Sequence, residues 1–270
     1  MTQEHENTES GREVEEREAL RSTQRPATLF LVVDVALFAL FMLQIFSFVY
    51  EGAEDAYISY RVARNCARGV GFVYNPGEYV EAVSNPLWTL ALAALYWLGA
   101  AMRWAGLILV VSYSALFFLV LRQTAFRLFG GRSWLARFPL LVAVCATHLP
   151  LGFGNMLEGS AVALVAVAIA WCAAARKPLG LALAAIVLML LRPEAPLYAV
   201  AIGLWIIFEA WRGRFRWLSM WRYMALTASA LLAIVLARAV YFGDIVPNTV
   251  RAKVPPPGDT VHWAGAELVR

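Results

Sequence analysis

The amino-acid sequence predicts an all-α protein, a polytopic bundle of transmembrane helices. Of its 270 residues, 61% are hydrophobic and only 16% are charged, whereas soluble domains are nearer half apolar and a quarter charged. Several apolar stretches approach the roughly twenty residues that a helix needs to cross the hydrocarbon core of a bilayer. Because no water reaches that core, backbone groups must be satisfied within each segment, and repeated spans therefore predict a helical bundle.

The charges divide the chain into an acidic start and a basic remainder. Residues 1–25 contain seven Glu and four Arg, which predicts a disordered cytoplasmic tail. In the remainder, basic residues cluster at the ends of apolar stretches. This placement is typical of contacts with lipid headgroups and of membrane topology. We therefore expect membrane lipids, and no nucleic acid, as partners.

The first predicted span is the apolar run from Pro26 to Tyr50. Arginines at 17, 21 and 25 precede it, which places the N-terminus in the cytoplasm under the positive-inside rule. Asp34 interrupts the run near its cytoplasmic end. We expect its side chain to snorkel towards the interface, as charges near helix ends do.

Charge also predicts the later topology, which has about seven crossings. Three basic connections are expected in the cytoplasm, at 122–137, 176–177 and 212–222. The helices between and around them are predicted near 104–121, 138–153, 160–175, 179–192, 195–210 and 223–241. An odd number of crossings must separate residue 51 from Arg122, so 86–101 is interpreted as a juxtamembrane or re-entrant helix on the outer side. Four segments are then external: 51–85, 154–160, 192–194 and everything after residue 242.

The segment 51–85 holds the first candidate functional residues. Glu54 and Asp55 follow the first span at the membrane surface, where a carboxylate can act as a general base. Arg61, Arg64 and Arg68 are spaced by three and four, so on a helix they share a face that could clamp a phosphate. A solvated loop and simple headgroup contact are the alternative interpretations.

The other external segments carry further polar residues. Glu158 lies at the start of a predicted helix, where it either takes part in a site or only complements the helix dipole. Arg192 and Glu194 place opposite charges in an apolar region, so they either face a cavity or pair with each other. Asp244, Asn248, Arg251 and Lys253 follow the last helix, and we find no ligand cluster that requires a metal.

As an ordered set, these motifs resemble the GT-C membrane glycosyltransferases. The set comprises EDAYISYR (54–61), NPGE (75–78), Val80-Glu81, Asn85, NMLEG (155–159), LRPE (191–194) and YFGDIVPNTVRAK (241–253). The resemblance spans about residues 30 to 255. It is greatest to the branch of mycobacterial terminal arabinofuranosyltransferases and related bacterial proteins.

The resemblance implies a GT-C-like transmembrane domain over 26–253, with its catalytic loop at 51–85. It implies inverting transfer of a sugar, a pentose such as arabinofuranose being one option, from a polyprenyl-phosphate donor to a cell-envelope or cell-wall glycan. It also implies a plasma-membrane location with the active-site loops outside. We expect no metal or other cofactor, because arginine and lysine side chains could stabilise the departing phosphate.

Site residues follow from the same resemblance. The family's loop usually begins with two aspartates, and here Asp55 is favoured as the base, with Glu54 as the alternative. The implied donor-phosphate ligands are Arg61, Arg64, Arg192 and Lys253. The implied substrate-binding residues are Glu81, Glu158, Glu194, Asp244 and Asn248.

Two other functions stay open. Members of the family are much longer, so the external tail at 254–270 is expected to be truncated relative to them, and a truncated pseudoenzyme would bind the donor without transferring sugar. A non-catalytic lipid-linked-sugar transporter or assembly subunit would need a polar path through the bilayer. The cytoplasmic halves of the predicted spans are almost wholly apolar, which disfavours such a path.

Overall fold

The computed structural model describes residues 28–49, 54–131 and 133–245. Within these ranges the regular structure is all helical, which confirms the predicted all-α class. The predicted tails at 1–25 and 254–270 lie outside the described residues.

Most of the described chain belongs to helices. They are the N-terminal helix (Thr28–Phe48), α2 (Glu54–Ala67), α3 (Pro86–Trp97), α4 (Met102–Phe129), the 3₁₀ turn η2 (Trp134–Ala136), α5 (Phe138–Cys145), α6 (His148–Gly154), α7 (Gly159–Ala174), α8 (Pro178–Leu191), α9 (Ala195–Trp211) and α10 (Trp217–Phe242). Prolines stand in the first turn of α3, α5, α8 and α9, where the missing N–H costs nothing. Gly130 and Gly243 end α4 and α10 with positive φ angles.

The prediction of seven crossings is wrong. Among the described residues, three helices are long and apolar enough to cross a membrane: the N-terminal helix, α4 and α10. A fourth span is counted only if the bent pair η2–α5 and α6 forms one broken span. The helices α7, α8 and α9 contain 16, 14 and 17 residues, so at 1.5 Å per residue they reach about 21–26 Å, less than the ~30 Å hydrocarbon core.

The predicted single helix at 138–153 is broken. The segments Trp134–Cys145 and His148–Gly154 meet at an angle of 57°. The break includes Ala146, whose backbone leaves the helical region with φ −80° and ψ 78°. Pro150 stands four residues later, and a proline ring clashes with the carbonyl of the fourth residue before it. The kink therefore follows directly from the sequence.

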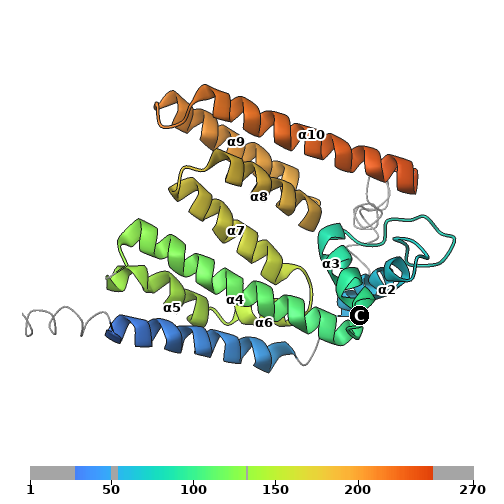
Figure 1. Ribbon diagram of the computed structural model, residues 1–270, viewed down its shortest axis with the longest axis horizontal. Helices are drawn as coiled ribbons and strands as arrows, with labels where there is room; N and C mark the ends of the chain where they lie inside the picture. Colours follow the sequence, from blue (N-terminus) through green and yellow to red (C-terminus); the bar gives the residue numbers. More distant parts are fainter. Residues whose placement is uncertain (1–27, 50–53, 132, 246–270) are drawn as a thin grey trace, which may run out of the picture.

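The connections gather at two opposite ends of the helical bundle (Figure 1). At the loop end lie 54–101, 154–158, 192–194 and 243–245. At the basic end lie the connections between α4 and α5, between α7 and α8, and between α9 and α10. This grouping confirms that the three basic connections share one end, and that the described parts of the candidate functional segments share the other.

Exposed tryptophans mark both ends of the bundle. Trp97 and Trp104 are exposed near the loop end, and four more are exposed at or near the basic end: Trp134, Trp211, Trp217 and Trp221. Tryptophan is enriched where a membrane protein meets the bilayer–water interface. The two groups thus flank the apolar middle of the bundle as interfacial anchors would.

The core lies where the N-terminal helix, α4, α6 and α7 meet. Phe41 contacts Phe117, Phe118 and Phe153 with ring centroids 5.5–6.1 Å apart. At the other side of the bundle, only 6% of the apolar window of α10 is buried, against 33% for the N-terminal helix and α4. α10 packs on α8 and α9 along one side only and leaves most of its residues at least partly exposed.

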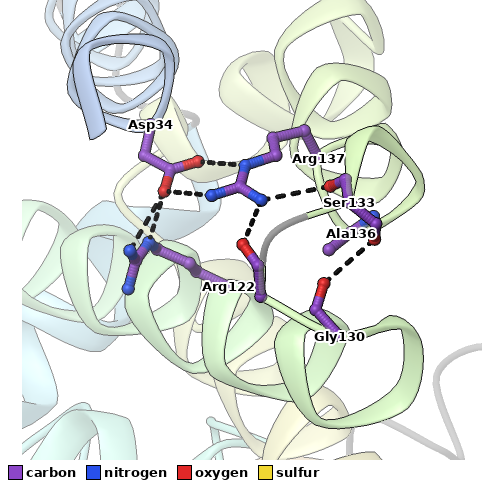
Figure 2. A network of polar contacts seen from close by, with 7 residues as sticks. Asp34, Arg122, Gly130, Ser133, Ala136 and Arg137 are labelled. Carbon is purple, nitrogen blue, oxygen red and sulfur yellow. Dashed lines mark hydrogen bonds and ion pairs between the residues drawn. The ribbon is translucent and has the colours of Figure 1, made fainter. Parts of the chain in front are cut away.

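Asp34 does not snorkel to the interface as predicted. Its side chain is only 4% exposed, and it lies between two arginines from distant parts of the chain (Figure 2). Arg137 donates from Nε (3.1 Å) and Nη2 (3.2 Å), and Arg122 donates from Nε (3.0 Å). The Arg137 guanidinium also packs on the rings of Phe30 and Phe126. The two guanidinium groups compensate the charge of the buried carboxylate, so its side chain does not have to be hydrated.

Candidate functional site

A cleft of about 730 Å³ opens at the loop end beside α2. It is lined by Val49, Ala56, Tyr57, Tyr60, Arg61, Arg64, Tyr74, Met102, Arg103 and Met156. Half of these residues belong to one face of α2, which begins with two carboxylates that complement its dipole. The opposite face of α2 packs on α3. This packing sets the orientation of α2 and so turns its other face towards the cleft.

Two predicted phosphate ligands, Arg61 and Arg64, line this cleft. Arg61 donates to the Tyr74 carbonyl oxygen (3.0 Å) and to Asn75 Oδ1 (2.9 Å), and its guanidinium lies over the Tyr74 ring. The NPG turn therefore holds Arg61 in place. A third arginine of the cleft, Arg103, was missed from sequence, although its position at the start of a long apolar helix could have indicated it.

Arg68 does not join the arginines of the cleft. It follows the end of α2 and donates to the Tyr96 hydroxyl at 2.9 Å. The predicted three-arginine face is therefore a two-arginine face.

Tyr60 forms part of the cleft wall and keeps its proton. Its hydroxyl donates to Met156 Sδ at 3.0 Å. The pKa of Tyr60 is raised to about 12, and burial of its hydroxyl is the largest cause. The ring packs so closely on Gly106 that a Cβ there would lie 3.1 Å from Cζ, so this wall requires glycine in α4.

The two candidate bases are both exposed in the first turn of α2. Neither Glu54 nor Asp55 is among the residues that line the cleft. At 3.6 residues per turn, Glu54 lies about two full turns before Arg61 and so on the same side of α2. Asp55 lies about two and a half turns before Arg64, on the opposite side. The helix geometry therefore favours Glu54 over Asp55, the reverse of the sequence-based preference.

A second polar cluster joins four elements beneath the loop end. Asn85, before α3, donates from Nδ2 to Glu158 Oε2 at 2.5 Å and accepts from Thr89 Oγ1 at 3.0 Å. Glu158, before α7, pairs through Oε1 with Arg192 Nη1 at 3.3 Å. Arg192 Nε also lies 3.6 Å from Glu194 Oε1. Asn85 and Glu158 are buried, whereas Arg192 and Glu194 reach solvent.

This cluster brings three predicted site residues together and separates them from the cleft. Arg192 pairs with Glu158 and Glu194, so the ion pair that was kept as an alternative for Arg192 and Glu194 is present. Arg192 is absent from the lining of the cleft. Asn85, which bonds Glu158, was part of the family motif but was not chosen as a site residue.

Glu81 forms a third contact, to the last helix. Its Oε1 lies 3.1 Å from Arg238 Nε, and both side chains are largely buried. Burial raises the pKa of Glu81, and Arg238 partly offsets that rise. Arg238 was missed from sequence because it sits inside an apolar stretch. Nearby, the Tyr241 hydroxyl accepts from the Phe72 amide at 2.8 Å, so the 71–85 segment is fastened to α10 twice.

The remaining predicted residues divide into described and undescribed ones. Asp244 follows α10 near Glu81, whose pKa it raises further. Asn248 and Lys253 lie outside the described residues. Within the part of the chain that the structure describes, no group of three or more His, Cys, Asp or Glu side chains is placed to hold a metal ion.

The fold and its three or four long apolar helices define the class: an all-α, multi-pass membrane protein. No protein-family description, characterised protein or solved structure matches the chain. Its function must therefore be inferred from the residues themselves.

Proposed function

We propose that the protein is a membrane glycosyltransferase of the GT-C class. It moves a sugar, such as a pentose, from a polyprenyl-phosphate donor to a cell-envelope glycan. The observation that supports this most is the arginine-lined cleft beside the carboxylates of α2. In this proposal the chain lies in the plasma membrane, with its N-terminus in the cytoplasm and the loop end outside.

The proposed chemistry is a single displacement at the anomeric carbon. A carboxylate takes the proton from an acceptor hydroxyl as its oxygen attacks, and the bond to the lipid phosphate breaks with inversion. The departing phosphate carries the electron pair. Arg61 and Arg64 face the cleft and would stabilise that charge, since guanidinium groups bind phosphate oxygens through paired hydrogen bonds.

Glu54 is the proposed base. It shares the side of α2 that carries Arg61, whereas Asp55 turns half a circle away from Arg64. A base must come within hydrogen-bond reach of the acceptor hydroxyl, so the residue on the cleft side is better placed. Arg192 is no longer proposed as a ligand of the donor phosphate, because Glu158 and Glu194 already pair with it. Its proposed role is structural.

The decisive experiment measures transfer of labelled sugar from polyprenyl-phosphate pentose and hexose donors to envelope glycan acceptors by the purified chain. Glu54→Gln should lower the rate about 10²–10⁴-fold, the usual contribution of a general base. Asp55→Asn should keep most of the activity. Asp55→Asn is therefore the matched control, since it removes the neighbouring exposed carboxylate of the same helical turn.

Each result has a clear meaning. Loss of transfer in Asp55→Asn alone would make Asp55 the base and overturn the assignment from helix geometry. Full activity in both variants would remove the α2 carboxylates from the mechanism. Donor binding without transfer in every version would indicate a transporter, an assembly subunit or a pseudoenzyme. No donor binding would refute the glycosyltransferase proposal for this chain.

A further inference from the structure

A cavity of about 360 Å³ lies at the basic end between α8 and α10. Its lining consists of Pro178, Leu179, Ala182, Ser219, Arg222, Tyr223, Ala225 and Leu226. The wall is apolar towards the middle of the bundle and carries Ser219 and Arg222 among its polar groups. This volume falls within the range of small-ligand sites. The cavity lies at the opposite end from the cleft of α2.

The charges around this cavity are strongly one-sided. Nine basic side chains belong to the described part of the basic end: Arg122, Arg127, Arg137, Arg176, Lys177, Arg212, Arg214, Arg216 and Arg222. The acidic residues there, Asp34 and Glu209, are already paired with arginines. Six of the nine basic groups contact a partner inside the protein. Of the other three, only Arg222 lines the cavity.

Tryptophans set the depth of the cavity in the bilayer. Trp217 and Trp221 are both exposed and stand one helical turn apart on α10. Exposed indole rings at a membrane protein's surface favour the headgroup level. Arg222 directly follows Trp221, so its guanidinium would lie near the level of the lipid phosphates. Ala182 and Leu226 lie about one helical turn further into α8 and α10, where they would meet the beginning of the acyl chains.

We propose that this cavity binds the headgroup of an anionic phospholipid. Arg222 would hold the lipid phosphate, the Ser219 hydroxyl would donate a hydrogen bond to it, and an acyl chain would lie along the apolar wall. Basic pockets between transmembrane helices bind anionic headgroups by this combination of charge and shape. The inference rests on the membrane class of the protein and is independent of the proposed glycosyltransfer.

The test is lipid retention by the purified full chain in neutral detergent, measured by native mass spectrometry. Phosphatidylglycerol and phosphatidylcholine of equal chain length are the two probes. The wild-type chain should retain one phosphatidylglycerol in preference to phosphatidylcholine. Arg222→Gln should weaken phosphatidylglycerol retention about tenfold or more, as expected for a hydrogen-bonded charge.

Two further variants separate the site from general attraction. Arg216→Gln removes another exposed arginine, from the start of the same helix, without touching the cavity lining, and should change retention less than about threefold. Ala225→Phe narrows the cavity without changing any charge and should also abolish the preference. Thermal unfolding in phosphatidylcholine verifies that each variant folds.

Two outcomes would overturn the proposal. Equal losses in Arg216→Gln and Arg222→Gln would show diffuse attraction to a basic surface. Equal retention of the two lipids, unaffected by Arg222→Gln, would show an apolar groove that takes acyl chains without reading the headgroup.

Discussion

The two ends of the bundle use arginine in opposite ways. At the basic end, Arg137 is buried, bonded through all three of its guanidinium nitrogens and packed on aromatic rings, and it pairs with Asp34 of the N-terminal helix (Figure 2). At the loop end, Arg61 and Arg64 are exposed and line a cleft. Among the described residues, Arg61 is bonded by the turn at Tyr74 and Asn75.

The difference separates structural charge from charge that is available to a ligand. A buried cation whose N–H donors already bond a carboxylate and backbone carbonyls cannot bind a substrate. Arg137 is in this state, since it also donates to the carbonyl oxygens of Gly131 and Ser133. A cation held by its edge over a cleft keeps donors free for a phosphate. The contrast can be tested by removing charges at both ends.

The largest effect on stability is expected from Asp34→Asn. It leaves Arg137 buried without its anion, and breaking a buried ion pair by removing one partner costs about 3–5 kcal/mol. Unfolding in a mixed-micelle denaturant titration measures the loss. The double variant Asp34→Asn/Arg137→Gln should lose less than the sum of the two single variants, because both belong to one network. A loss below about 1 kcal/mol for Asp34→Asn would contradict a structural role for this end.

A smaller, pH-dependent effect is expected at Glu81. Because burial raises the pKa of this carboxyl above its ordinary value near 4.5, the folded chain holds the proton more tightly than the unfolded chain. The Glu81 contribution to stability is therefore greatest below the ordinary pKa and falls as pH rises through the raised pKa.

The measurement compares wild type with Glu81→Gln between about pH 4 and 7.5. The difference in unfolding free energy, wild type minus variant, should fall with rising pH. A tenfold difference in proton affinity between the folded and unfolded chains corresponds to a fall of about 1.4 kcal/mol. Exposed Glu78→Gln should change stability by no more than about 0.5 kcal/mol at any pH. A difference that grows with pH would mean that Arg238 outweighs burial and lowers the pKa of Glu81.

The smallest effect is expected from Glu194→Gln. Its partner Arg192 is 42% exposed and Glu194 itself 46%, and exposed ion pairs contribute about 0–1 kcal/mol. Glu158→Gln should cost more, since Glu158 is buried and bonds both Asn85 and Arg192. Thermal unfolding of the two variants side by side measures the order. A reversed order would show that the loop-end cluster depends on its solvent-facing half.

The helices and their grouping at two ends were predictable from sequence, because apolar runs and basic connections are local signals. α7, α8 and α9 begin and end within about one residue of their predicted bounds. The number of crossings was overestimated because helices of only 14 to 17 residues were counted as full spans. At 1.5 Å per residue they are shorter than the hydrocarbon core. The kink before Pro150 was also missed, although proline at that position gives a sufficient steric reason.

The site was predictable only in part, because pairing across distant segments has no local signature. The sequence suggested Arg61 and Arg64 as neighbours, and both do line the cleft. It could not show that Asn85 and Arg192 share Glu158, or that Arg238 reaches Glu81. Residues within apolar stretches, such as Arg238 and Asp34, gain their partners only when helices pack.

The unequal helix lengths have a consequence for the surrounding lipids. α4 and α10 extend about 42 and 39 Å, whereas α8 and α9 extend about 21 and 26 Å. Lipids beside α9, which exposes Leu197, Val200 and Leu204, therefore meet a much shorter apolar surface than lipids beside α10. Such hydrophobic mismatch is relieved by local thinning of the bilayer and by helix tilt. Acyl-chain length, and so the thickness of the host membrane, is therefore expected to affect the two flanks of this bundle differently.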